Sequence, residues 1–221
     1  MNCFVLATRN AHKVGEIRRI LGHQVRLLSQ SDFPGAPAVV EDATTFAGNA
    51  AKKAEGLSDW LAGHAPAALA GRTYYVLADD SGLEVDALGG APGVHSARFA
   101  AEDAAGTDNS PDAANNAKLL RLLEHVPSER RTARFRCVLA LAAQRQGTRL
   151  FEGSCEGRIA RVPGGAGGFG YDPLFVPEGF TQSFAELGED VKNTISHRAL
   201  AFAQLRRFLE GVARSKEAPC L

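Results

Sequence analysis

The order of strand-like and helix-like segments limits the folds that this chain can adopt. In the first half, short apolar runs that are typical of buried strands alternate with segments in which apolar or small residues recur at helical spacing. In the second half, two long strand-like runs, at 133–143 and 148–159, meet at Gln146-Gly147, which predicts a hairpin. This order predicts an α/β fold: a mixed central sheet flanked by helices, with a central cleft between two lobes.

Local signals predict where several elements begin and end. Asn10 is placed to cap a helix that ends at Gly22, and Thr44 or Thr45 is placed to cap the next helix. The expected strands of the first half lie at 3–7, 24–28 and 74–78. Two further helices are expected, at 113–123 and from Ser196 onward.

Composition argues against several classes of protein. The 25 Lys and Arg residues balance the 25 Asp and Glu residues, so the chain lacks the basic field that non-specific nucleic-acid binding needs. We expect no signal peptide and no membrane span. The four cysteines lack C-x-x-C spacing, which fits a reducing, cytoplasmic setting. We expect residues 1–214 to form a single two-lobed domain and residues 215–221 a frayed tail.

The segment Thr8-Arg9-Asn10-Ala11-His12-Lys13 lies at an expected strand-to-helix junction. Free backbone amides at a helix N-terminus attract anions, and Lys13, one turn into the helix, can reach the same anion. The pattern therefore predicts a phosphate site. An ordinary capped helix with a solvated lysine has the same sequence signature, so this segment alone leaves both readings open.

Two adjacent aspartates follow the apolar run at 74–78, in the segment Asp79-Asp80-Ser81-Gly82, and we expect them at the end of that strand. Neighbouring residues of a strand point to opposite faces, so the two carboxylates should have different roles. Carboxylates beside an apolar strand need hydrogen bonds or a cation. Hard oxygen ligands favour magnesium that is shared with substrate phosphates. A solvated turn is the alternative.

A glycine-rich segment, Gly167-Gly168-Phe169-Gly170-Tyr171-Asp172-Pro173, places a carboxylate among aromatic rings. Stacking on a ring and hydrogen bonding to a base edge are the means by which proteins hold a purine. A glycine-rich hairpin loop with packed rings fits the same residues. The segment is not a P-loop, because no G-x-x-x-x-G-K-[ST] sequence occurs in the chain.

Basic residues gather where the last helix is expected to begin, at Lys192 and in the run Ser196-His197-Arg198. Ser196 is placed as the N-cap, which would orient His197 and Arg198 at the positive end of the helix. Alone, the run also fits a capped helix with exposed basic residues.

Together with Thr45-Phe46-Ala47-Gly48-Asn49-Ala50 and Leu88-Gly89-Gly90-Ala91-Pro92-Gly93, these four segments closely resemble the inosine triphosphate pyrophosphatase family, also called dITP/XTP pyrophosphatases. The resemblance runs in order from Phe4 to Phe208. It implies an enzyme that hydrolyses non-canonical purine nucleoside triphosphates (ITP, dITP and XTP) to the monophosphate and pyrophosphate. It also implies magnesium as cofactor, a substrate cleft between the lobes and a homodimer.

The resemblance further implies a role for each matching residue. Asp80 would be the catalytic base, and Glu41 and Asp80 would hold the metal ion. The substrate-binding residues would be Thr8, Arg9, Asn10, Lys13, Lys53, Ser81, Phe169, Gly170, Tyr171, Asp172, Lys192, His197 and Arg198. The chain departs from the family pattern at Arg9, where a glycine is common, and at Gly48, where many members have glutamate.

Arg198 predicts how the base would be selected. Arginine can only donate hydrogen bonds, so it suits the carbonyl oxygen at purine position 6 of inosine and xanthosine, whereas the amino group of adenine would leave it unpaired. An unpaired buried polar group costs about 1–3 kcal/mol. Two alternatives are a related pyrophosphatase for methylated or pyrimidine nucleotides and a nucleotide-binding regulator without catalytic activity. The presence of Asp80, Glu41 and Lys13 argues against the second alternative.

Overall fold

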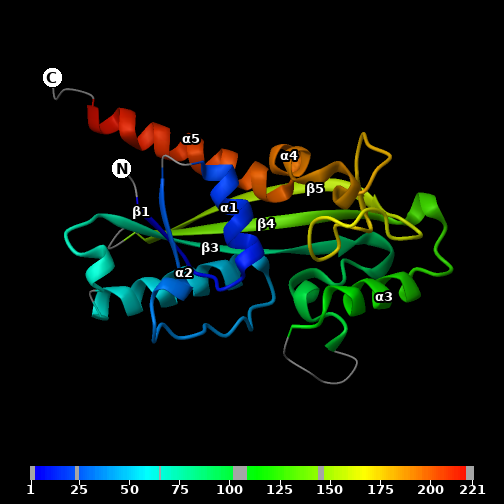
Figure 1. Cartoon of the computed structure of the whole chain (residues 1–221), viewed down its shortest axis with the longest axis horizontal. Coiled ribbons are helices and arrows are strands. Elements are labelled where there is room, and N and C mark those ends of the chain that lie inside the picture. Colours follow the sequence, from blue (N-terminus) through cyan, green and yellow to red (C-terminus); the bar gives the residue numbers. More distant parts are fainter. Residues whose placement is uncertain (1–2, 23–24, 65, 102–108, 144–146, 218–221) are drawn as a thin grey trace.

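Six strands form one mixed sheet (Figure 1): β1 (Cys3–Leu6), β2 (Arg26–Ser29), β3 (Tyr74–Val85), β4 (Thr132–Ala143), β5 (Gly147–Ile159) and β6 (Phe175–Pro177). Their order in the sheet is β2-β1-β3-β4-β5-β6. Strand β1 pairs in parallel with β2 and β3, and the other pairs are antiparallel. The computed structural model describes residues 3–22, 25–64, 66–101, 109–143 and 147–217. The expected turn residue Gln146 and the last four residues of the expected tail lie outside these ranges.

Helices cover both faces of the sheet: α1 (Ala11–Leu21), α2 (Phe46–His64), α3 (Asp112–Leu122), α4 (Phe184–Ile195) and α5 (His197–Glu217). Helix α2 packs against Val76 and Ala78 of β3, while α1 and α5 pack on the opposite face around Leu77. A third apolar core joins α3 and the first turn of α4 to the far ends of β3, β4 and β5. This arrangement confirms the expected mixed sheet flanked by helices. Helix α5 continues past residue 215, the expected start of the tail.

Local capping sets the helix ends where the sequence predicts them. Asn10 caps α1 by accepting hydrogen bonds from backbone N–H groups two and three residues later, and Gly22 ends this helix. Thr45 and Ser196 each accept a hydrogen bond from the backbone N–H three residues later, at the starts of α2 and α5. Within the described ranges, no helix combines the length and apolar character that crossing a membrane requires.

Strand β3 corrects one expectation, because it does not end before Asp79 but continues through both aspartates to Val85. A buried carboxylate destabilises the fold unless it is paired or hydrogen-bonded. Both aspartates are buried, and each meets a cation from another element. Gly82 allows the segment Gly93–Arg98 to pack directly on the strand, since a Cβ atom there would lie 2.4 Å from the Ser96 hydroxyl oxygen. The aspartates therefore lie in the middle of β3, below the cleft.

Gly153 of β5 lies directly beneath the start of α5, the helix that carries Arg198. A Cβ atom at this position would lie 2.1 Å from the His197 carbonyl oxygen and 2.6 Å from the Ala201 nitrogen, and neither backbone atom can turn aside. We therefore expect Gly153→Ala to lower the free energy of unfolding by about 2–3 kcal/mol, as overpacking does. Urea unfolding measures this change. Gly63→Ala is the matched control, because a Cβ atom on Gly63 meets nothing within 4 Å. Equal stability of the two variants would contradict the prediction.

Candidate active site

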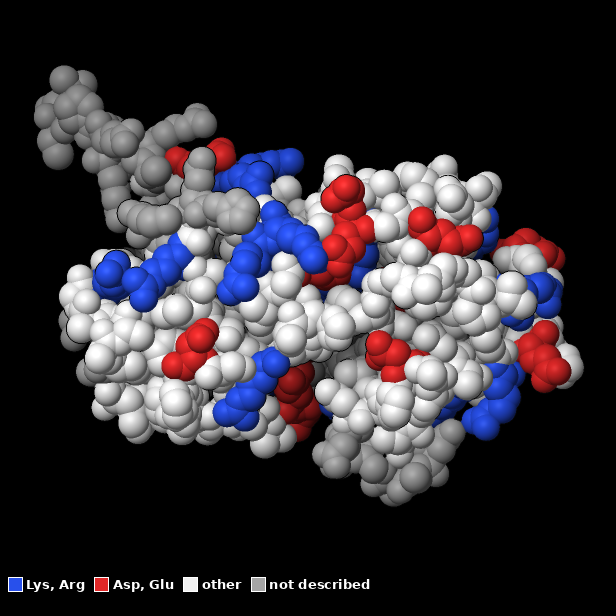
Figure 2. Space-filling view, in the orientation of Figure 1, with Lys and Arg blue, Asp and Glu red and all other residues white. Residues whose placement is uncertain are grey.

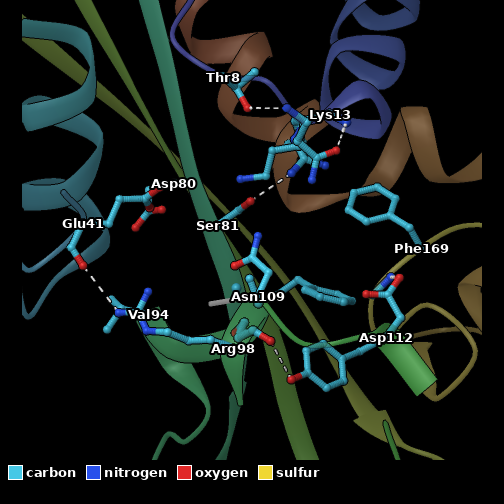
Figure 3. A pocket seen from close by; sticks show the side chains of 18 of the residues that line it. Thr8, Lys13, Glu41, Asp80, Ser81, Val94, Arg98, Asn109, Asp112 and Phe169 are labelled. Atoms are coloured by element: carbon cyan, nitrogen blue, oxygen red, sulfur yellow. Dashed lines mark hydrogen bonds between the residues drawn. The ribbon is translucent and has the colours of Figure 1, made fainter. Parts of the chain in front are cut away.

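A cleft of about 510 Å³ lies between the two lobes, and every residue for which the sequence predicts a site role lines it. Its walls come from the turn between β1 and α1, the loop before α2, strand β3, the segment Gly93–Arg98 and the glycine-rich segment at 167–173. Figure 2 shows the surface hollowed between the lobes, and Figure 3 shows side chains from these segments pointing toward one another. Segments that are far apart in the sequence therefore meet in one site.

The N-terminus of α1 forms one wall of the cleft. The Asn10 side chain accepts hydrogen bonds from the N–H groups of His12 and Lys13 at 2.9 and 3.1 Å, and Thr8 Oγ1 accepts one from the Asn10 N–H at 3.2 Å. Lys13 Nζ lies 2.5 Å from Asp79 Oδ1. The helix end thus presents a cation to the cleft, but Asp79 already balances its charge.

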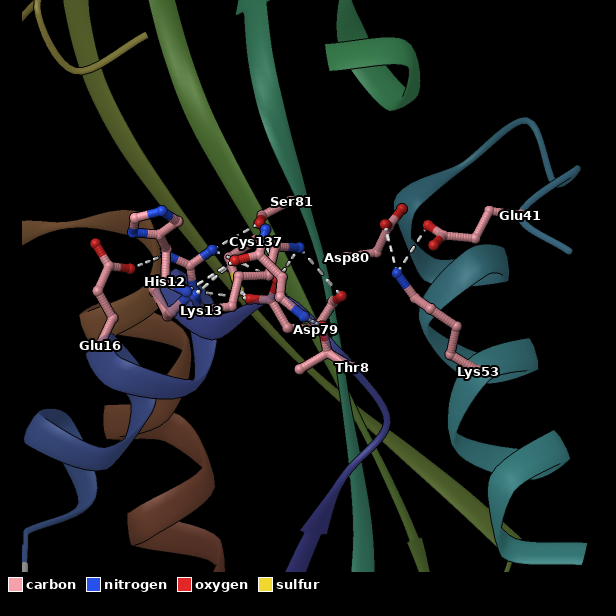
Figure 4. Close-up of polar contacts among 12 residues, drawn as sticks. Thr8, His12, Lys13, Glu16, Glu41, Lys53, Asp79, Asp80, Ser81 and Cys137 are labelled. Carbon is pink, nitrogen blue, oxygen red and sulfur yellow. Dashed lines mark hydrogen bonds and ion pairs between the residues drawn. The ribbon is translucent and has the colours of Figure 1, made fainter. Parts of the chain in front are cut away.

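Asp80 and Glu41 meet at the ammonium group of Lys53 (Figure 4). Lys53 Nζ donates to Asp80 Oδ1 and to Glu41 Oε2, both at 2.8 Å. Burial raises the pKa of Asp80 to about 6, although Lys53 acts in the opposite direction. Burial also opposes ionisation of Glu41, but there Lys53 outweighs it and lowers the pKa. Asp80 is therefore a stronger base than an ordinary aspartate, and it lies beside an ionised partner.

One oxygen of this acidic pair is left unsatisfied. Asp80 Oδ2 is buried and has no hydrogen-bond partner among the residues that the structure describes. The Glu41 side chain is 40% exposed, so its carboxylate can be reached from the cleft. Two carboxylates that converge in this way suit a hard divalent cation that takes its other ligands from water and phosphate. In the described part of the chain, no cluster of three or more acidic, His or Cys side chains could enclose a metal ion alone.

A buried ionic network runs behind the cleft from Asp79. Arg198, which is only 1% exposed, donates from Nε to Asp79 Oδ2 at 3.0 Å and also pairs with Glu16. Glu16 pairs with Lys192 at 2.6 Å, and Lys192 pairs with Asp172 at 2.6 Å. The charges alternate along the order Lys13, Asp79, Arg198, Glu16, Lys192 and Asp172. This network links the helix end at one side of the cleft to the glycine-rich segment at the other.

The network also explains why the two aspartates differ. Burial opposes ionisation of Asp79, but Arg198 and Lys13 outweigh it and hold the pKa of this carboxyl well below its usual range. Asp79 is therefore a permanent anion inside the protein, whereas Asp80, on the other face of β3, faces Lys53. The two carboxylates therefore have different surroundings, and the expectation that their roles differ stays a prediction.

The glycine-rich segment presents Phe169 to the cleft and buries its neighbours. Tyr171 is 3% exposed and donates its hydroxyl hydrogen to the Ser96 carbonyl oxygen at 2.8 Å. Asp172 Oδ2 accepts from the Phe169 N–H at 2.9 Å as well as from Lys192. Lys192 Nζ lies 4.5 Å from the centre of the Phe169 ring. Of these two aromatic rings, Phe169 is the less buried, and the His12 ring stacks on it with the centroids 5.4 Å apart.

His197 forms part of the inner wall of the cleft rather than its rim. The side chain is buried, and its ring stacks on Phe135 with the centroids 4.8 Å apart. Burial, together with the neighbouring charges of Arg198 and Lys192, lowers the pKa of His197 well below its usual range. The imidazole is therefore neutral at neutral pH.

Three residues that hold site residues in place were not predicted from the sequence. Glu16 holds both Arg198 and Lys192, and its position one helical turn after Lys13 was an available signal. Asp112 accepts a hydrogen bond from the Gly170 N–H at 2.7 Å, and the Asn116 amide donates one to the Gly170 carbonyl at 2.9 Å. These two residues fix the peptide beside Phe169 to α3, and no local pattern in the sequence indicates this contact.

The fold and the cleft define an α/β protein in which cations and an acidic pair surround a site for an anionic ligand. Residues 4–208 match the Ham1 family, and the chain belongs to this family. A dITP/XTP pyrophosphatase of Desulforamulus reducens is 50% identical over 208 residues, which cover 93% of this chain and 94% of the relative. A dITP/XTP pyrophosphatase of Opitutus terrae is 49% identical, with 90% and 95% covered.

Solved structures of relatives agree with this assignment. A HAM1 protein from Coxiella burnetii is 36% identical and superposes with a TM-score of 0.79, covering 96% of this chain and 100% of its own. A nucleoside-triphosphatase, or dITP/XTP pyrophosphatase, from Mycobacterium abscessus is 39% identical with a TM-score of 0.69, covering 93% and 98%. The resemblance to dITP/XTP pyrophosphatases that the sequence motifs indicate is therefore confirmed.

Proposed function

We propose that this protein hydrolyses the non-canonical purine nucleoside triphosphates ITP, dITP and XTP to the monophosphate and pyrophosphate, and that it does so as a homodimer. The observation that carries the activity is the state of Asp80. This carboxylate has a raised pKa of about 6 and one oxygen without a partner among the described residues, and it lies next to Glu41 and Lys53 in a cleft of nucleotide size. The names of relatives that are 49 and 50% identical support the same activity.

In this proposal the phosphates bind at the N-terminus of α1, where Thr8, Arg9, Asn10 and Lys13 line the cleft. The N–H groups of His12 and Lys13 already donate to Asn10, so the attraction for phosphate comes from the positive helix end and the side chains of Arg9 and Lys13. The Asp80 carboxylate accepts the proton of the attacking water, and with a pKa of about 6 it is mostly ionised at pH 7. Phosphoryl transfer depends mainly on positioning and charge stabilisation, so no covalent intermediate is needed.

Magnesium is the proposed cofactor. Glu41 and Asp80 would hold it, because they supply an accessible carboxylate and a buried oxygen without a partner. A bound Mg²⁺ ion neutralises negative charge on the phosphates and lowers the pKa of water. Lys53 keeps the two carboxylates together, so that they need little rearrangement to face the same ion.

The base is proposed to bind at the opposite end of the cleft, stacked on Phe169. Four of the five N–H groups of Arg198 are directed to Asp79, Glu16 and Ser81, which leaves one on Nη1 without a partner among the described residues. A fixed donor of this kind can pair with the carbonyl oxygen at purine position 6 but not with the amino group of adenine. Leaving it unpaired costs about 1–3 kcal/mol, which corresponds to about 5- to 150-fold discrimination.

A substrate panel tests the proposed function. We expect the purified protein with Mg²⁺ to release pyrophosphate from ITP, dITP and XTP with a kcat/KM about 100-fold above that for ATP. A pyrophosphate-release assay measures this ratio. Equal values for all nucleotides would contradict the proposed base selection. Fastest hydrolysis of methylated or pyrimidine nucleotides would instead indicate the related pyrophosphatase, and binding without turnover would indicate the regulator.

A further inference from the structure

Two cations that line the cleft, Arg9 and Arg98, form no ion pair with a carboxylate among the described residues. The four other Lys and Arg side chains that line the cleft each form at least one. Arg9 donates to the Ala36 carbonyl oxygen at 2.5 Å, and Arg98 donates to the Glu41 carbonyl oxygen at 3.4 Å. Both partners are neutral, so these two arginines bring unbalanced positive charge to the cleft.

Arg98 reaches the loop before α2 from the segment Gly93–Arg98, on a different wall of the cleft. It is the last residue of the short helix Gly93–Arg98, which packs on β3 at Gly82. Figure 3 shows its side chain extending toward the backbone of Glu41, where the dashed line marks the hydrogen bond. The guanidinium group therefore lies next to the residue that we propose as a metal ligand.

We propose that Arg98 binds the terminal phosphates of the substrate, and hence the pyrophosphate product. This inference rests on the proposed function. A hydrogen bond of 3.4 Å to a neutral carbonyl is weak, whereas a guanidinium–phosphate contact is charge-assisted and can use two N–H groups at once. A phosphate that enters the cleft therefore competes well for this side chain.

The position of Arg98 favours the phosphate chain over the base. Arg98 donates to the backbone carbonyl oxygen of Glu41. The carboxylate of the same residue is bridged to Asp80 by Lys53, at the end of the cleft where we propose that hydrolysis occurs. Lys13 and Lys53 also lie near this end, but carboxylates already balance their charges. The two terminal phosphates carry most of the negative charge of a triphosphate, so they need a cation that has no such partner. Of Arg9 and Arg98, it is Arg98 that contacts Glu41.

Binding of pyrophosphate and of IMP to the full-length protein with Mg²⁺, measured by calorimetry, tests the proposal. Arg98→Ala should raise the Kd for pyrophosphate by about 10-fold or more and change that for IMP by less than about 2-fold. Arg206→Ala is the matched control, because Arg206 is an exposed arginine outside the cleft lining that also donates to a backbone carbonyl, that of Ile20 at 2.9 Å. It should change neither constant.

A second variant keeps the test decisive if Arg98→Ala does not fold, as judged by thermal unfolding. Arg98→Lys keeps the charge but loses the planar fork, so its Kd for pyrophosphate should lie between those of the parent and the alanine variant. An unchanged Kd for pyrophosphate in the folded variants would overturn the proposal. Equal losses for pyrophosphate and IMP would overturn it too, since they would indicate general damage to the cleft. Absence of ITP hydrolysis by the unsubstituted protein would instead count against the proposed function.

Discussion

Asp80→Asn should lower kcat for ITP hydrolysis by about 10³-fold or more. Asparagine keeps the shape of the side chain, but it cannot take a proton from water and it offers a cation only a neutral oxygen. The substitution therefore removes both proposed roles of Asp80 in one step. Initial rates over a series of Mg²⁺ concentrations, for variant and parent, measure the effect. Turnover close to that of the parent would remove Asp80 from the mechanism, and recovery at high Mg²⁺ would leave it only the metal-binding role.

Unfolding measurements separate a loss of chemistry from a loss of fold in this variant. Because burial raises the pKa of Asp80 from 3.8 to about 6, the folded protein holds a proton there that the unfolded chain releases. The contribution of this group to the free energy of unfolding is therefore fully present below pH 3.8 and is lost as the pH rises through about 6. At pH 7.5 without metal, Asp80→Asn should be at least as stable as the parent. Marked destabilisation would mean that the pairing with Lys53 matters more than the burial of the charge.

Arg198→Ala should affect both stability and selectivity. The alanine leaves Asp79 and Glu16 without their shared buried partner, and breaking a buried ion pair from one side costs about 3–5 kcal/mol. For a chain of this length, we expect a fall in Tm of roughly 6–20 °C. The ratio of kcat/KM for ITP to that for ATP should fall by about 5- to 150-fold. Differential scanning calorimetry and the substrate panel measure the two effects.

Arg198→Lys separates these two effects. Lysine restores the positive charge between Asp79 and Glu16, so it should recover part of the lost stability. It cannot reproduce the planar arrangement that leaves one N–H group on Nη1 for the base, so the ITP to ATP ratio should stay low. A lysine variant with full selectivity would show that charge alone, rather than the fixed N–H group, reads the base.

Contacts between neighbours in sequence account for the parts of the fold that could be predicted. Asn10 and Gly22 set the ends of α1 through hydrogen bonds that span only a few residues, and such contacts leave a readable pattern. Asp79 is the opposite case, since its partner Arg198 lies 119 residues away. Nothing local indicated that β3 could continue through a carboxylate, and the end of that strand was accordingly predicted too early.

Helix α4 and strand β6 were not predicted, for different reasons. Gly188 has a φ of 79° inside α4 and interrupts the helical pattern, although Ser183 and Glu186 form a capping box at its start. Strand β6 has three residues and exists through its pairing with β5. In the site, the residues that the sequence motifs single out line one cleft, but their pairing within the ionic network required the three-dimensional arrangement. Glu16, between Arg198 and Lys192, is the clearest example.

Strands β3, β4 and β5, of 12, 12 and 13 residues, are common to both lobes. At about 3.4 Å per residue, each spans roughly 40 Å. The β3–β4 ladder is continuous from Tyr75 opposite Ala143 to Val85 opposite Ala133, so the two lobes share one uninterrupted sheet. Enclosing a nucleotide must then either bend these shared strands or move only the segments at the rim of the cleft, where Glu41 and Arg98 lie. Release of products would require the same strands or rim segments to move back.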